Sequence, residues 1–282
     1  MNWRNVLRLI SVDTKSGRLI RGQRLRRYTE NKLFPYLLYG GSCVLGIAAG
    51  FVFGNLYNAV AEMEIKTLRT GLLSFFVSVP TLVLMYSIVF TMMSQIQRTG
   101  IRASLQPPYW LPITWEEHTL ASTLANLLGV PLASIVLIGS FIAVASLFLG
   151  EIALATLTIF ALLGSAFLAS TTTEIFRVLQ VRFIGAVYKS SGRAAIWVRF
   201  LGTMLFLIAF YIVWFAFTSG ANYVAIVEGI AGAQSALWFI PYIWFGIALA
   251  FFIEGLLAHM VIFSLASLLF ILILFSAATR LN

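Results

Sequence analysis

Few side chains in this sequence could do chemistry at an active site, and their spacing argues against several kinds of site. Two histidines are present, His118 and His259, far apart in the chain. A zinc protease needs a His-Glu-x-x-His pattern or an equivalent set of ligands, and neither histidine belongs to one. No stretch matches the Gly-x-x-x-x-Gly-Lys-Ser/Thr loop that cradles nucleotide phosphates. We therefore expect no metal site, no cofactor bound by this chain and no enzyme activity of its own.

Glu254 and His259 fall inside a long apolar stretch, from about residue 236 to 278. Ionisable groups are costly in lipid, so these two are the candidates for a functional polar site within a membrane. A proton-coupled secondary transporter usually has several carboxylates near mid-membrane and two halves related by a repeat. Because this stretch has one carboxylate and the sequence shows no repeat, a secondary transporter is retained only as an alternative.

The composition is that of a membrane protein. Hydrophobic residues make up 60% of the chain and charged residues 10%, against roughly 25% charged in soluble domains. Stretches of about 20 apolar residues are long enough to cross a hydrocarbon core of about 30 Å as helices. The predicted fold is all-α, a polytopic bundle of six transmembrane helices. The spans are expected at 34–56, 71–93, 124–149, 152–173 and 198–218, with the sixth inside 236–278.

The final apolar stretch is longer than one span. Pro241 and Glu254 interrupt it, and irregular backbone at membrane depth is tolerated only where protein or a water-filled cavity covers it. A re-entrant outer hairpin before the last span is therefore favoured over a seventh span, which stays open.

Basic residues predict the orientation, because they resist translocation. The segment 1–33 carries nine Lys and Arg residues, which places the N-terminus in the cytoplasm of a multi-pass protein of the cell membrane. The loops 94–123 and 174–197 then also fall inside. The net charge of +9 lies mainly in these segments between apolar runs, which argues against nucleic acid as a partner.

The cytoplasmic segment 1–33 begins as a basic amphipathic helix. Four apolar residues recur at helical spacing beside Arg4 and Arg8, a pattern typical of a helix that lies on anionic membrane lipid. They are Trp3, Val6, Leu7 and Ile10. The remainder, 34–282, is expected to form the transmembrane domain.

Two cytoplasmic loops contain stiff or basic elements. In "QPPYWLPITWEEHTL", residues 106–120, three prolines stiffen the chain, and Thr114 with Glu117 fits a capping box that would start a short helix. The second loop is helical and basic. Because the chain has no ATP-binding loop of its own, these two rigid cytoplasmic elements suggest a docking face for a soluble partner.

The order of these parts resembles the membrane subunits of type 2 ABC exporters, the permeases that pair with a separate ATP-binding cassette subunit. The sequence-specific part of the resemblance is a loop after the second span of the form Leu-Pro-Ile/Leu-Ser/Thr-x-x-Glu. The resemblance implies that this loop is the coupling helix and that a second cytoplasmic contact lies in 174–197. The implied coupling residues are Leu111, Pro112, Ile113, Thr114, Trp115, Glu116, Glu117 and His118, and the second contact is Arg177, Arg182, Lys189 and Arg193.

The same resemblance implies partners. ATP and Mg would bind to the soluble ABC ATPase subunit, and a second permease half, identical or different, would complete a path for a hydrophobic or amphipathic substrate or a polymer. The run Glu116-Glu117-His118 is more acidic than the family's usual basic run after Leu-Pro. A non-catalytic structural membrane subunit of a larger complex is the other alternative.

Overall fold

The computed structural model describes residues 2–21, 28–30, 33–59, 62–99, 114–188, 204, 211 and 223–281. Nearly all of them are helical. The helices are α1 (Trp3–Arg18), α2 (Leu33–Ala59), α3 (Glu62–Thr99), α4 (Trp115–Leu127), α5 (Val130–Leu149), α6 (Ile152–Tyr188), α8 (Tyr223–Ala236), η1 (Pro241–Ile243), α9 (Trp244–Ile253) and α10 (Leu257–Leu281).

Five helices in the described ranges are long and apolar enough to cross a membrane. These segments are Leu33–Ala59, Arg69–Met92, Pro131–Leu149, Ile152–Leu179 and Leu257–Leu281. They confirm the predicted first, second and fourth spans and the last crossing. The predicted fifth span, 198–218, lies outside the described residues apart from Met204 and Tyr211.

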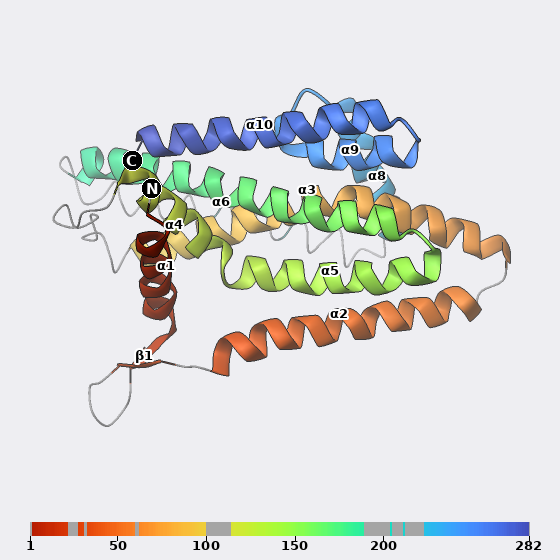
Figure 1. Cartoon of the computed structure of the whole chain (residues 1–282), viewed down its shortest axis with the longest axis horizontal. Coiled ribbons are helices and arrows are strands. Elements are labelled where there is room, and N and C mark those ends of the chain that lie inside the picture. Colours follow the sequence, from red (N-terminus) through yellow and green to blue (C-terminus); the bar gives the residue numbers. More distant parts are fainter. Residues whose placement is uncertain are drawn as a thin grey trace.

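The long helices run side by side, and α1 lies across one end of the bundle (Figure 1). That end, here called the terminal end, also holds both ends of the described chain, α4 and the last turns of α6. The opposite end holds the junctions between α2 and α3, between α5 and α6 and between α9 and α10. At this opposite end Arg69 and Glu151 form an ion pair of 2.7 Å.

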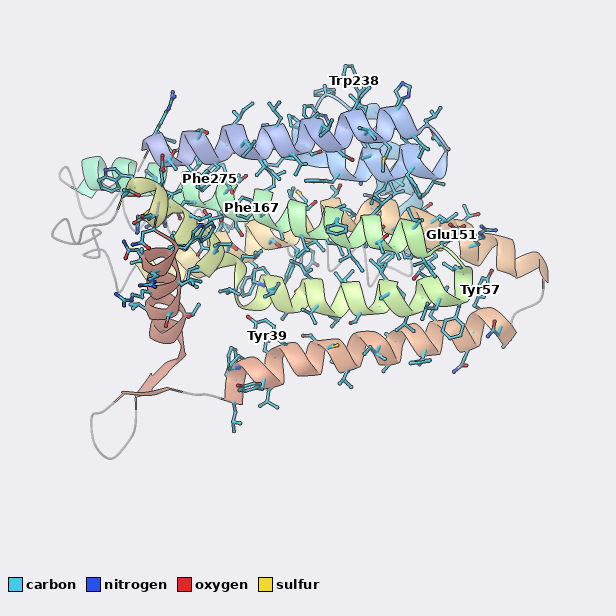
Figure 2. The ribbon with its side chains drawn as sticks, in the orientation of Figure 1. Tyr39, Tyr57, Glu151, Phe167, Trp238 and Phe275 are labelled. Carbon is cyan, nitrogen blue, oxygen red and sulfur yellow. The ribbon has the colours of Figure 1, made fainter. Side chains whose placement is uncertain are left out.

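Two tyrosines mark the length of α2. Figure 2 shows Tyr39 towards one end of the helix and Tyr57 towards the other. At a rise of 1.5 Å per residue the two are about 27 Å apart, close to the thickness of a hydrocarbon core of about 30 Å. Tyrosine is enriched at both interfaces of a membrane, so this spacing fits a helix that crosses it.

Helix α6 is the centre of the bundle. It contacts α3, α4, α5, α9 and α10. Its five consecutive residues 170–174, Ser-Thr-Thr-Thr-Glu, are all buried, which requires neighbours on every side of the helix. A displacement of α6 would therefore change the packing of most helices in the bundle.

The predicted third span, 124–149, is wrong as one continuous helix. Helix α4 ends at Leu127 and α5 begins at Val130. Between them Gly129 has φ 134°, a conformation that favours glycine, and a proline follows at the first turn of α5. Helix α4 is therefore a separate element at the terminal end.

The all-α prediction is confirmed for the bundle but misses a short ribbon in the N-terminal segment. Strands β1 (Leu19–Arg21) and β2 (Tyr28–Glu30) pair antiparallel, with Ile20 opposite Thr29. The amphipathic helix is confirmed and continues to Arg18.

Candidate functional site

The start of α4 is fixed by a capping box, as the sequence predicts. Thr114 has extended backbone, and its side chain accepts a hydrogen bond of 3.3 Å from the backbone N–H of Glu117. The Glu117 carboxylate in turn accepts from the backbone N–H of Thr114, at 3.5 Å. Two of the N–H groups at the helix start are thus satisfied, which stabilises a helix beginning at Trp115.

The same carboxylate binds the N-terminal helix. Glu117 is 3% exposed, and it accepts hydrogen bonds from the backbone N–H of Asn2 and, at 3.3 Å, from the side-chain amide of Asn5. Val6, one turn further along α1, is completely buried. Helices α1 and α4 are therefore held together by a buried carboxylate beside an apolar contact.

These hydrogen bonds favour the charged form of the carboxyl group. The backbone N–H of Asn2 is the main cause that lowers the pKa of Glu117, and the amide of Asn5 and the backbone N–H of Thr114 act in the same direction. Burial opposes them but does not prevail. Glu117 is accordingly an anion at neutral pH, which strengthens each bond that it accepts.

A second polar link joins α4 to the central helix α6. The hydroxyl of Ser122 donates to Oε2 of Glu174 at 2.8 Å, and the guanidinium of Arg177 donates to both oxygens of the same carboxylate, with an Nε–Oε2 distance of 2.9 Å. Glu174 is fully buried, whereas the side chain of Arg177 is 30% exposed. Helix α4 is thus attached to α1 at its first turn and to α6 near its middle.

The five predicted coupling residues that the structure describes divide into two sets. Thr114, Trp115 and Glu116 are exposed and form the outer edge of the α4 start, here called the docking edge. Glu117 points the other way, into the contact with α1, and His118 is half-buried. Leu111, Pro112 and Ile113 lie outside the described residues.

Of the four basic residues in the predicted second contact, the structure describes the side chain of Arg177 only. Arg177 forms an ion pair with Glu174, and its side chain is 30% exposed. Arg182 lies in the last turns of α6, and its side chain is outside the described part of the structure, as are Lys189 and Arg193 altogether.

Glu254 and His259 lie at the opposite end of the bundle. Glu254 ends α9, in the turn before α10, and is exposed. His259 is also exposed, and its ring lies on Phe251 with centroids 5.2 Å apart. The structure therefore does not bring these two groups to the middle of the bundle.

The segment before α9 has polar contacts that sequence reasoning missed. The amide nitrogen of Gln234, near the end of α8, donates to the hydroxyl of Thr81 at 2.9 Å. Tyr242 lies beside Thr172 of α6, with 3.3 Å between the two hydroxyl oxygens. These side chains attach the short helices to α3 and α6.

A bundle with five apolar helices of spanning length indicates a multi-pass membrane protein. Among the described side chains, no three His, Cys, Asp or Glu residues come together in a group that could hold a metal ion. No protein-family model, curated protein or solved structure matches the chain.

Proposed function

We propose that this chain is the permease subunit of an ATP-driven ABC exporter of type 2, coupled to a separate ATP-binding cassette subunit. The observation that carries the proposal is the start of α4. A capped helix at the terminal end presents Thr114, Trp115 and Glu116 outwards, in the segment whose sequence resembles the family's coupling helix. The side chains behind this edge connect it to the bundle.

These hydrogen bonds couple α4 mechanically to its neighbours. A displacement of the docking edge would move α1 through Glu117, and it would move the central helix α6 through Ser122 and Glu174. Hydrogen bonds to a buried anion are strong and directional, so α4 would move with its neighbours rather than slide past them. Closure of the ATPase could in this way bias which side of the path is open.

We infer six crossings with a re-entrant hairpin, as the sequence predicts. Figure 1 shows α8 and α9 in the half of the bundle away from the termini. Tyr242, between them, packs on Phe270 with ring centroids 5.3 Å apart, and Phe270 lies about 20 Å along α10 from its start. A segment that reaches this depth and returns along α9 to the opposite end fits a hairpin that does not cross.

The remaining assignments follow from the same proposal. The terminal end would face the cytoplasm of a cell, because α1, which belongs to the basic segment 1–33, lies there. ATP and Mg would be held by the ATPase, and a second permease half would complete the path for a hydrophobic or amphipathic substrate or a polymer.

Capture of the partner tests the proposal. The intact chain, extracted from its native membranes in mild detergent, should bring down a soluble subunit that hydrolyses ATP. Glu116→Lys should abolish this capture, because it reverses the charge on the docking edge. Glu254→Lys is the matched control, since it makes the same change at an exposed site on the opposite end.

Capture of the ATPase by the parent and the control but not by Glu116→Lys would support a docking edge on α4. A folded parent that brings down no ATPase would refute the exporter assignment and leave a structural membrane subunit as the better description.

A further inference from the structure

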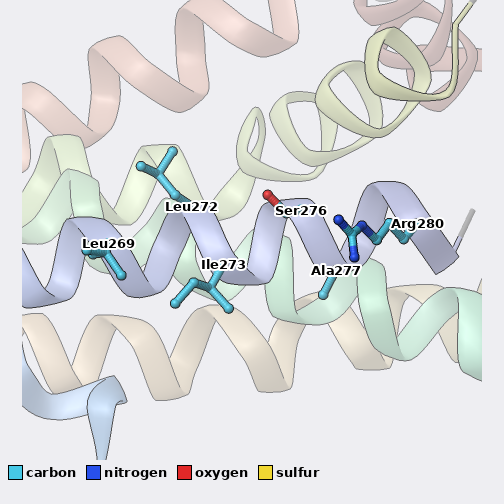
Figure 3. A pocket seen from close by; sticks show the side chains of 6 residues that line it. All are labelled: Leu269, Leu272, Ile273, Ser276, Ala277 and Arg280. Carbon is cyan, nitrogen blue, oxygen red and sulfur yellow. The ribbon is translucent and has the colours of Figure 1, made fainter.

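The last three turns of α10 carry a shallow groove of about 440 Å³ on the outside of the described bundle (Figure 3). Its lining residues recur every three or four positions, so they form one stripe along the helix. They are Leu269, Leu272, Ile273, Ser276, Ala277 and Arg280. No function described above uses this stripe.

The stripe has the dimensions and the order of polarity of one membrane leaflet. Leu269 and Arg280 are about 16 Å apart along the helix axis, close to half of a hydrocarbon core of about 30 Å. Large apolar side chains come first, then the hydroxyl of Ser276, then the guanidinium of Arg280 at the terminal end. A phospholipid has the same sequence of groups, from acyl chain to glycerol to phosphate.

The charge at the end of the groove favours an anion. Arg280 is exposed, and the ion pairs among the described side chains do not include it. The buried carboxylates Glu117 and Glu174 are engaged with α1 and Arg177. Guanidinium groups bind phosphate oxygens in a bidentate way, and one free at a membrane interface suits a lipid phosphate.

The walls of the groove favour an acyl chain over a second helix. Leu272 is 65% exposed and Ile273 is 55% exposed, so bulky branched side chains stand out from the surface. Close helix contacts in membranes use small residues instead, as α2 does where Gly46, Gly50 and Gly54 meet α5. The surface of α10 offers no such seam at this place.

We propose that this groove is a binding site for an anionic phospholipid of the leaflet at the terminal end, with an acyl chain along α10 and the phosphate on Arg280. The site requires only that the protein spans a membrane and does not depend on the exporter assignment.

The experiment counts lipids that stay bound. The intact chain is reconstituted in bilayers of equal parts phosphatidylglycerol and phosphatidylcholine, re-extracted in mild detergent, and examined by native mass spectrometry. The parent should retain one phosphatidylglycerol in preference to phosphatidylcholine. Arg280→Gln should lower its retention about fivefold, the effect of about 1 kcal/mol for one basic residue near an anionic surface.

Two further variants distinguish a specific phospholipid site from diffuse electrostatic attraction of anionic lipid. Ala277→Phe places a ring in the groove without changing charge and should lower retention as much as Arg280→Gln. Arg69→Gln removes one exposed positive charge from the opposite end and should change retention less than twofold.

The proposal is overturned if the parent retains no phosphatidylglycerol, or retains phosphatidylcholine equally well. Equal losses in Arg69→Gln and Arg280→Gln would also overturn it, because they would show diffuse electrostatic attraction. Full retention in Ala277→Phe would show that the groove holds no acyl chain.

Discussion

Replacement of Gly46 by alanine should loosen the contact between α2 and α5. A methyl group at this position would begin 2.2 Å from the backbone carbonyl oxygen of Leu137 and 2.1 Å from the hydroxyl of Ser140. The hydroxyl can rotate away, whereas the carbonyl belongs to the backbone of α5 and cannot. Helix α2 must therefore retreat by about 1 Å to restore ordinary van der Waals distances.

The cost follows from how α2 is held. Its buried residues are Gly46, Gly50 and Gly54, so the face that approaches α5 carries most of its packing within the described bundle. A gap of 0.5–1 Å forfeits roughly a quarter to a half of each dispersion contact, and overpacking a tight site usually costs about 1–3 kcal/mol. Alanine also gains up to about 1 kcal/mol over glycine within a helix. We expect a net loss of about 1–2 kcal/mol in the free energy of unfolding.

The measurement is a denaturation titration of the purified chain with SDS in mild detergent, followed by circular dichroism. Gly40→Ala is the matched control, because nothing lies within 4 Å of a side chain added at Gly40 on the same helix. Gly54→Ala should be milder than Gly46→Ala, since the atoms it meets belong to the ring of Phe148, which can turn aside. Equal stability of Gly46→Ala and Gly40→Ala would refute the close backbone contact.

Three further changes test other contacts. The lowered pKa of Glu117 means that its hydrogen bonds to α1 should be fully formed above the ordinary glutamate value of 4.5 and be lost only as pH falls further, through the lowered pKa; a spin label on α1 whose mobility never changed during acidification would contradict this. Glu174→Gln removes the anion from a buried pair and should cost about 3 kcal/mol in the same SDS titration, whereas Glu151→Gln, at an exposed pair, should cost less than about 1 kcal/mol; similar costs would argue against the burial of the first pair. Gly246→Ala would place a methyl 2.8 Å from the carbonyl oxygen of Val77 and should lower the midpoint of thermal unfolding; an unchanged midpoint would argue against this close approach of α9 to α3.

The helices of the bundle were predictable because the membrane sets a length that apolar runs must match. Leu33–Ala59 and Ile152–Leu179 contain the predicted spans 34–56 and 152–173 with errors of only a few residues at most ends. The cap of α4 was also predictable, since a capping box depends on two residues three positions apart.

Two further features had local signals that the sequence analysis did not use. Gly129 with Pro131 two residues later is a common way to end one helix and begin another, and it marks the break before α5. The spacing Gly46-x-x-x-Gly50-x-x-x-Gly54 is a helix-packing motif in membranes, and it marks the face of α2 that meets α5.

The partners of the buried carboxylates had no such signal. Asn2 and Glu117 are 115 positions apart, and Ser122 and Glu174 are 52 apart. Periodicity shows which face of a helix is apolar, but it does not show which other helix covers a single polar side chain. The spacing of Glu174 and Arg177 suggests a pair on one helix, yet only the fold shows that the pair is buried and joined to α4.

The two adjacent carboxylates at the start of α4 do different work because a helix turns by about 100° per residue. Glu116 is on the docking edge, and Glu117 is bound to α1. A variant that changes both would release α1 as well as alter the edge, so loss of a partner could follow from either cause. Glu116→Lys alone changes the edge, while Glu117→Gln alone removes the charge that holds α1. If the proposed docking and the attachment of α1 are separate functions of one helix, Glu116→Lys should abolish capture of the proposed ATPase with α1 still immobile, and Glu117→Gln should release α1 without abolishing that capture.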